Sequence, residues 1–284
     1  MPGSPVPGSP VPSGLLIMRH AGRTHPGRRG GENEDSIGWD EAQQLWFVAD
    51  GMGGHASGEV ASNIVKQTLL ASGASPLIEA VHKAHEAVAR AAAQANSNMG
   101  STVVALRLQE REGEIVWVGD SRAYLWRDRA LQPVTRDHSF LELLREQENL
   151  SDEQLRGHPQ KNLVTQTLGL ATPEPSASII ALRNGDWFLL CSDGLNDELE
   201  DREMAAILQA HPAPAAAADA LIAAALARGG RDNVSAVIVE YSGPNGVSFL
   251  RRFPKKAMLW LPVVAGVLAA VLAAGLWWWF RARN

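Results

Sequence analysis

The sequence predicts an α+β fold in which strands and helices form separate layers. Six short runs rich in β-branched and aromatic residues are separated by tight turns, at 45–49, 102–108, 115–118, 123–126, 187–191 and 234–240. Four stretches with apolar residues at helical spacing come in two groups, at 59–70 and 76–95 and at 198–210 and 215–228. Consecutive strands favour antiparallel sheets, and grouped helices favour covering layers on those sheets.

The composition is that of a globular protein with a sizeable core. The chain has 284 residues, of which 45% are hydrophobic and 20% charged, with a formal net charge of −5. A nucleic-acid partner is not expected, because binding phosphates requires a basic surface. Cys191 is the only cysteine, so the chain cannot form an internal disulfide. Its apolar neighbours predict a buried core residue and not a nucleophile.

Four segments follow one another along the chain. Residues 1–14 contain two copies of Gly-Ser-Pro-Val-Pro, which predicts an extended arm without a packed core. The mixed pattern of strands and helices occupies residues 15–241 and predicts one folded domain. Within it, the polar segment 137–162 is expected to form a surface flap. Residues 242–256 predict a basic tether.

Residues 257–280 predict one transmembrane helix. The segment has no charged residue and is long enough to cross a bilayer core of roughly 30 Å. Tryptophans lie near both ends of the segment, where the membrane interface favours them. Four basic residues precede the segment and two follow it, which favours a cytoplasmic globular domain. The expected location is therefore the inner membrane, with a single pass.

Aspartates beside glycine recur where strands end or begin. Asp50 and Asp193 each end an apolar run and precede a glycine, whereas Asp120 follows one. Asp232 lies just before the last predicted strand. Each of them alone could be an ordinary turn or capping residue. A rigid carboxylate at a strand end is also what a hard cation needs, so four such sites suggest metal binding.

Six motifs in order make the chain resemble the bacterial form of the protein phosphatase 2C family. The resemblance spans roughly residues 22–241, nearly the whole predicted domain. The motifs are Glu32-Asn33-Glu34-Asp35, Asp50-Gly51-Met52-Gly53-Gly54-His55, Met99-Gly100-Ser101-Thr102, Gly119-Asp120-Ser121-Arg122, Cys191-Ser192-Asp193-Gly194-Leu195 and Asp232-Asn233.

The resemblance implies a four-layer α/β/β/α sandwich of two mostly antiparallel sheets, with two Mn²⁺ or Mg²⁺ ions at one edge. By position, the catalytic Asp50 would bridge the two ions, and the Gly51 carbonyl would bind one of them. The catalytic Asp193 and Asp232 would hold the other ion, and Glu34 would act through a water. A third, weaker ion would involve Asp120 together with Asp193.

The implied reaction is hydrolysis of phosphoserine and phosphothreonine in proteins. Paired cations supply a hydroxide near neutral pH, so no protein nucleophile is needed. All-oxygen ligands favour Mg²⁺ or Mn²⁺ over zinc. The expected partners are phosphorylated proteins, including a membrane-associated serine/threonine kinase. The family resemblance does not assign the general acid in this chain.

The sequence departs from the family pattern where an arginine binds the substrate phosphate. The family has an arginine four residues before the glutamate of its Asn-Glu-Asp motif, and this chain has Gly30 there. Arg29 or Arg28 could reach the site through a shifted loop, and Arg29 is preferred. Both could instead be solvated loop charges.

Two other functions remain open at this stage. A catalytically silent, phosphoprotein-binding scaffold of the same fold would agree with the displaced arginine, although the intact aspartates argue against it. An unrelated divalent-metal hydrolase of small phosphate esters would use the same ligand types. Comparing phosphopeptides with nucleotides and sugar phosphates as substrates would separate the hydrolases.

Overall fold

The computed structural model describes residues 17–53, 57–109, 111–148, 160, 163–170 and 172–243. These residues belong to one compact unit. The predicted arm 1–14, most of the tether 242–256 and the predicted span 257–280 lie outside the described residues. No helix in the described ranges is long and apolar enough to cross a membrane.

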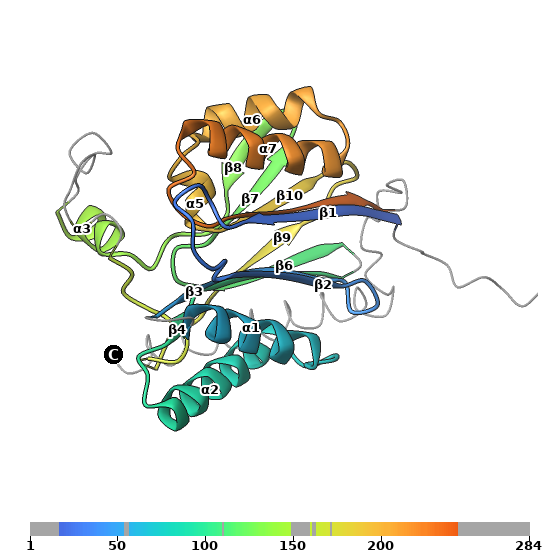
Figure 1. Ribbon diagram of the computed structural model, residues 1–284. Helices are drawn as coiled ribbons and strands as arrows, with labels where there is room; N and C mark the ends of the chain where they lie inside the picture. The colour runs from blue at the N-terminus through green and yellow to red at the C-terminus, as the bar shows by residue number, and fades with distance from the viewer. Residues whose placement is uncertain are drawn as a thin grey trace, which may run out of the picture. The chain divides into compact units, whose positions relative to one another are not determined.

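The first sheet has five antiparallel strands in the order β1-β11-β10-β7-β8 (Figure 1). Their bounds are Ile17–His25 for β1, Arg122–Arg127 for β7, Ala130–Pro133 for β8, Trp187–Cys191 for β10 and Val234–Ser242 for β11. The first and last strands of the domain are therefore neighbours, with Ile17 opposite Ser242 and His25 opposite Val234.

The second sheet has the order β2-β3-β5-β6-β9, and β4 pairs with the end of β3. Its strands are Asp35–Asp40 for β2, Leu45–Met52 for β3, Gly100–Ser101 for β4, Val103–Gln109 for β5, Glu112–Val118 for β6 and Ser176–Ala181 for β9. All of its pairings are antiparallel as well.

Helices cover the outer face of each sheet. The helices are Ser57–Leu70 (α1), Leu77–Ala95 (α2), Phe140–Glu148 (α3), Asp193–Asn196 (α5), Asp201–Ala210 (α6) and Pro214–Arg228 (α7). Helices α1 and α2 lie on the second sheet, whereas α6 and α7 lie on the first (Figure 1). Helix α3 lies apart from the sheets, at one end of the domain (Figure 1).

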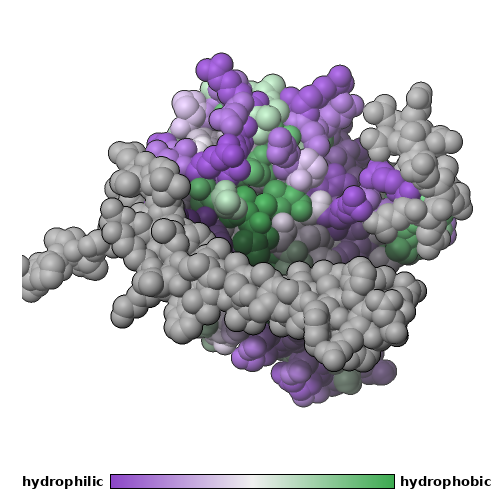
Figure 2. Space-filling model, turned by 180° about the vertical axis from the view of Figure 1, so that it is seen from behind, coloured by the Kyte–Doolittle hydropathy of each residue, from purple (hydrophilic) through white to green (hydrophobic). Residues whose placement is uncertain are grey.

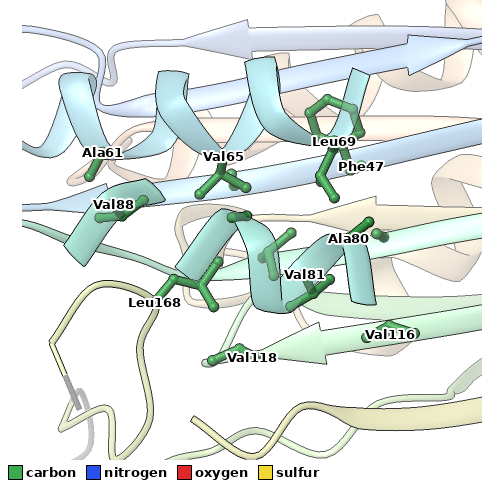
Figure 3. Close-up of a cluster of buried hydrophobic side chains, with 14 of the residues drawn as sticks. Phe47, Ala61, Val65, Leu69, Ala80, Val81, Val88, Val116, Val118 and Leu168 are labelled. Atoms are coloured by element: carbon green, nitrogen blue, oxygen red, sulfur yellow. The ribbon is translucent and has the colours of Figure 1, made fainter. Parts of the chain in front are cut away.

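The resulting order is helix pair, sheet, sheet, helix pair, as the family resemblance implied. Charged and polar side chains surround an apolar area on the face seen in Figure 2. One hydrophobic core lies between α1, α2 and the second sheet, and includes Phe47, Val65 and Val81 (Figure 3). A second core fills the space between the sheets, and a third lies under α6 and α7.

All six predicted strands and all four predicted helices are present, with ends shifted by a few residues. The additional strands β1, β2, β4, β8 and β9 were not predicted. The predicted flap, 137–162, begins with α3, and most of the residues after Glu148 lie outside the described ranges.

Candidate active site

Five aspartates lie at one end of the two sheets. In the second sheet, Asp35 and Asp50 are register partners in β2 and β3. In the first sheet, Asp193 follows β10, whereas Asp120 precedes β7 and Asp232 precedes β11. Because β10 is antiparallel to both of its neighbours, its C-terminal end lies beside their N-terminal ends. The structure thus brings together aspartates that are far apart in the sequence.

These carboxylates act on one another electrostatically. Burial raises the pKa of Asp50 well above its usual value, and the charges of Asp35, Asp193, Asp120 and Asp232 raise it further. Burial also raises the pKa of Asp193 to about 6, with a further contribution from Asp232, while a hydrogen bond with Asp50 lowers it. The pKa of Asp120 is raised to about 8, first by burial and then by Asp193. Ionising all of these carboxylates together is therefore costly, which favours either protons or bound cations at this end of the sheets.

Asp35 joins the two sheets behind this cluster. Its side chain is only 6% exposed, and Oδ2 accepts hydrogen bonds from Ser192 Oγ at 2.7 Å and from Ser235 Oγ at 2.6 Å. Burial raises the pKa of Asp35 to about 7, although these hydroxyl groups lower it. Oδ1 is buried and has no partner among the described residues. The sequence motif contained Asp35, but gave it no role.

Glu34 lies against the start of α1 through two glycines. A Cβ on Gly58 would be 2.3 Å from Glu34 Oε2, and a Cβ on Gly51 would be 2.0 Å from the Gly58 carbonyl oxygen. Only glycine permits this close approach. Burial, followed by the charges of Glu32 and Asp232, raises the pKa of Glu34. Glu34 therefore lies within electrostatic reach of Asp232 in the acidic cluster.

The donor set fits hard divalent cations. Within the described ranges, no three Asp, Glu, His or Cys side chains form a complete ligand group by themselves. A site here would need backbone carbonyl groups or water as additional ligands. The residues present fit such a site, because clustered carboxylate oxygens are the ligands that Mg²⁺ and Mn²⁺ prefer.

Hydroxyl groups fix the backbone around Asp50. The Asp50 N–H donates to Thr102 Oγ1 at 3.1 Å, and Ser101 Oγ donates to the Asp50 carbonyl oxygen at 3.0 Å. Thr102 Oγ1 also bonds Ser121 Oγ at 2.7 Å. Since Ser121 follows Asp120, this buried hydroxyl pair connects the strand end that carries Asp50 with the turn that carries Asp120.

Asn233 holds the loop that leads to Glu34. Its Nδ2 donates to the carbonyl oxygens of Pro26 at 3.2 Å and Glu32 at 3.3 Å. Its Oδ1 accepts from the Glu34 N–H at 2.7 Å. The side chain therefore satisfies backbone groups at both ends of the loop.

The same loop carries both candidate arginines. The Arg28 N–H donates to the Gly230 carbonyl oxygen at 2.7 Å, and a Cβ on Gly27 would lie 2.2 Å from the Asp232 carbonyl oxygen. The loop thus packs directly against the chain beside Asp232. The side chains of Arg28 and Arg29 are both exposed. Both residues lie at the margin of the acidic cluster, and both are accessible to a substrate phosphate there.

The start of the flap is held by two side chains. Arg122 forms a bidentate pair with Asp137, with bonds of 2.8 Å from Nε and 2.6 Å from Nη2. His138 Nδ1 accepts from the Gly119 N–H at 3.2 Å, and Nε2 bonds Ser176 Oγ at 2.9 Å. Burial lowers the pKa of His138, which favours the neutral ring with its proton on Nε2.

Cys191 is fully buried, as predicted. Burial raises the pKa of its thiol to about 12. The thiolate is therefore scarce at neutral pH, and Cys191 is a core residue.

The fold and the acidic cluster define a class: an α+β sandwich whose one end fits divalent-metal chemistry. A family model described as protein phosphatase 2C matches residues 21–228. The chain belongs to the protein phosphatase 2C family.

Relatives of known name support this assignment. The serine/threonine protein phosphatase PstP of Mycobacterium tuberculosis is 35% identical over 235 residues, which cover 79% of this chain but only 45% of PstP. The serine/threonine phosphatase stp of Listeria monocytogenes is 36% identical, covering 77% of this chain and 94% of that protein. A crystal structure of the PstP catalytic domain, in complex with two manganese ions, superposes with a TM-score of 0.71 at 34% identity. The superposed region covers 100% of that chain and 80% of this one.

Proposed function

We propose that this protein hydrolyses phosphoserine and phosphothreonine in other proteins. The observation that carries the proposal is the acidic end of the sandwich, where Asp50 lies among four other aspartates. The names of the PstP and stp relatives support the substrate class. The intact cluster argues against a silent scaffold, because a binding module has no need of unbalanced buried charge.

Two Mn²⁺ or Mg²⁺ ions are the proposed cofactors, by analogy with the two manganese ions of PstP. Asp50 would bridge them, with Asp193 and Asp232 on one ion and the Gly51 carbonyl group on the other. Glu34 would contribute through water, and a third ion would involve Asp120. When bound, such ions supply an activated water near neutral pH. Asp35 and the hydroxyl groups around Asp50 would keep the carboxylates in place.

An arginine of the loop at Gly27 would bind the substrate phosphate. Arg29 is the preferred residue and Arg28 the alternative. Arg29→Ala should raise KM for a phosphopeptide about tenfold, while Arg28→Ala should change it less. The reverse order would assign the role to Arg28.

The apolar segment 257–280 is proposed to anchor the enzyme in the inner membrane with its catalytic domain in the cytoplasm. A membrane-associated serine/threonine kinase would then be the opposing enzyme. The sequence supports this proposal through the charge-free segment and its basic flank. Deleting residues 257–284 should move the protein from the membrane fraction to the soluble fraction, and retention at the membrane would contradict the anchor.

The activity is tested by phosphate release from a phosphothreonine peptide by the full chain in detergent. Turnover should require Mn²⁺ or Mg²⁺, cease with chelator and collapse in Asp193→Asn. Nucleotides and sugar phosphates serve as competing substrates, and faster turnover of these would favour a small-ester hydrolase. A folded protein that binds the phosphopeptide without turnover would support the scaffold.

A further inference from the structure

Four strands form the outer edges of the two sheets, and one of them differs from the rest. Exposed edges invite pairing with another chain unless charge, proline or short length protects them. β1 carries Arg19 and Arg23, β8 has four residues and ends at Pro133, and β2 ends with Asp40. β9, with the sequence Ser-Ala-Ser-Ile-Ile-Ala, has no charge and no proline. Its edge alone lacks these protections.

The pairing with β6 shows which backbone groups of β9 point outward. The Leu182 N–H donates to the Arg111 carbonyl oxygen at 2.8 Å, directly beyond the last pair of the ladder. Hydrogen-bonded pairs alternate along an antiparallel ladder. The even-numbered residues of β9 therefore bond β6, whereas the N–H and C=O groups of Ala177, Ile179 and Ala181 face away from it.

Among the described residues, a hydrogen bond to an outward-facing backbone group of β9 is found at only one end of the strand. The Ala181 carbonyl oxygen accepts a hydrogen bond from Arg127 Nη2 at 2.7 Å. For Ala177 and Ile179, no partner of the outward groups is found among the described residues, and the Ile179 side chain is 59% exposed. An added antiparallel strand could exchange two hydrogen bonds with each of these residues.

The two faces beside the edge differ in chemistry. On the face shared with α2, Ile179 is opposite Glu114 and Ala181 is opposite Glu112, which is exposed. Arg107 is opposite Glu114 in β5 but is buried, so the exposed charge there is acidic. Basic side chains of an added strand would therefore be favoured on this face, with their aliphatic stems over Ile179.

The other face borders the core between the sheets. Ile180, Leu182 and Val134 are partly buried against that core. Figure 2 shows an apolar area on the side of the domain away from the viewer of Figure 1. Apolar side chains of an added strand would be favoured here, because they would bury the margin of this core.

We propose that the outer edge of β9 binds an extended segment of a partner protein as an additional antiparallel strand. In that segment, lysine or arginine alternates with valine, isoleucine or threonine. The basic residues face Glu112 and Glu114, and the apolar residues face Ile180 and Leu182. Main-chain hydrogen bonds supply affinity, and the alternating side chains supply specificity.

This edge also leads to the acidic end of the domain. Ser176, the first residue of β9, bonds His138, which in turn accepts from the Gly119 N–H beside Asp120. A segment bound along β9 therefore has one end near the acidic cluster. The binding itself does not depend on phosphatase activity.

The test uses the full chain in detergent and an eight-residue fluorescent peptide in which lysine and valine alternate. We expect saturable binding that weakens with salt. Ile179→Pro removes an outward N–H and no bond to β6, and proline is tolerated at such edge positions. It should weaken binding at least about tenfold, corresponding to the loss of edge hydrogen bonds. Ile179→Thr keeps the N–H and should bind as the wild type does.

Two further measurements keep the result specific. Ile179→Pro should retain the wild-type melting temperature and hydrolysis of a small aryl phosphate, which excludes misfolding. Glu112→Gln should weaken binding about threefold and reduce its salt dependence. Absent peptide binding, or equal binding by Ile179→Pro, would overturn the proposal. So would sedimentation showing a dimer that Ile179→Pro dissociates, since a second copy would then occupy the edge.

Discussion

Strand β10 has an aspartate beyond each of its ends, and the two aspartates have neighbours of opposite charge. Asp186, before the strand, is 1% exposed and accepts bonds from Arg127 Nε at 2.8 Å and Nη2 at 2.6 Å. The Arg183 N–H donates to it at 2.6 Å. Asp193, after the strand, is half-buried among other carboxylates, and its pKa is raised to about 6.

The difference separates structural from functional charge. A buried carboxylate with a bidentate arginine has its charge balanced within the domain, so it serves the fold. A carboxylate whose neighbours are also acids is costly to ionise, and either a proton or a bound cation can offset its charge. Perturbed pKa values therefore mark the acidic end as the candidate functional site.

The largest effect should come from Asp50→Asn at the acidic end. Phosphopeptide turnover should fall roughly 10³-fold or more, because the central carboxylate of the proposed metal site is lost. The metal-free protein should not lose stability, since the substitution removes a repelling charge. Steady-state kinetics and thermal melting in chelator measure both. A folded variant with normal turnover would show that the two ends do not differ in function.

At the opposite end, Asp186→Asn should act on stability and not on chemistry. It leaves the Arg127 guanidinium half-paired, which should cost about 3 kcal/mol of unfolding free energy. A domain of this size should then melt roughly 6–12 °C lower. Turnover per folded molecule should stay within about twofold of the wild-type value. Loss of activity without loss of stability would contradict the division between the two ends.

A smaller effect is expected from pH in the metal-free protein. The folded-state pKa values of Asp35 (about 7), Asp193 (about 6) and Asp120 (about 8) all lie above the ordinary value of 3.8. The folded state therefore binds protons that the unfolded state releases, so stability rises as pH falls from about 8 towards 5. We expect the melting temperature in chelator to increase over this interval.

Saturating Mn²⁺ should weaken or reverse this trend, because bound cations favour the ionised carboxylates. Identical pH profiles with chelator and with Mn²⁺ would show that the acidic cluster does not bind the ion.

The smallest predicted effect concerns Asn233, which holds the loop of the candidate arginines. Asn233→Ala removes three hydrogen bonds to backbone groups and should cost about 1–2 kcal/mol of stability. KM for a phosphopeptide should rise more than kcat falls, because the loop, and not the carboxylates, loses its position. Asn233→Asp keeps the acceptor for the Glu34 N–H and should be affected less. An equal change in kcat would place Asn233 closer to the reaction itself.

The sequence predicted the interior of this fold better than its edges. The strands β3, β10 and β11 each contain a run of at least four consecutive apolar residues, since both of their faces are covered. β1 and β2 carry charged residues, and β9 consists of serine, alanine and isoleucine without a regular alternation. Such edge strands depend on a partner strand for their structure, and the local pattern does not reveal that partner.

The candidate site shows the same limit. Spacing and family resemblance identified Asp50, Asp193 and Asp232, but no local pattern showed that they meet. Asp35 had no assigned role because its partners, Ser192 and Ser235, come from distant segments and look like turn or strand residues in the sequence. Asp35 lies in the second sheet, whereas Ser192 and Ser235 belong to the first, so the packing of the two sheets brings these three residues together.

Strand β11 also acts as a spacer. Asp232 lies just before its first residue, Val234, and Ser242 is its last. The eight steps from Val234 to Ser242, at about 3.3 Å each, separate the two strand ends by about 26 Å. Ser242 therefore lies at the end of the first sheet opposite to the acidic cluster, so the last described residues leave the entrance to the candidate site open.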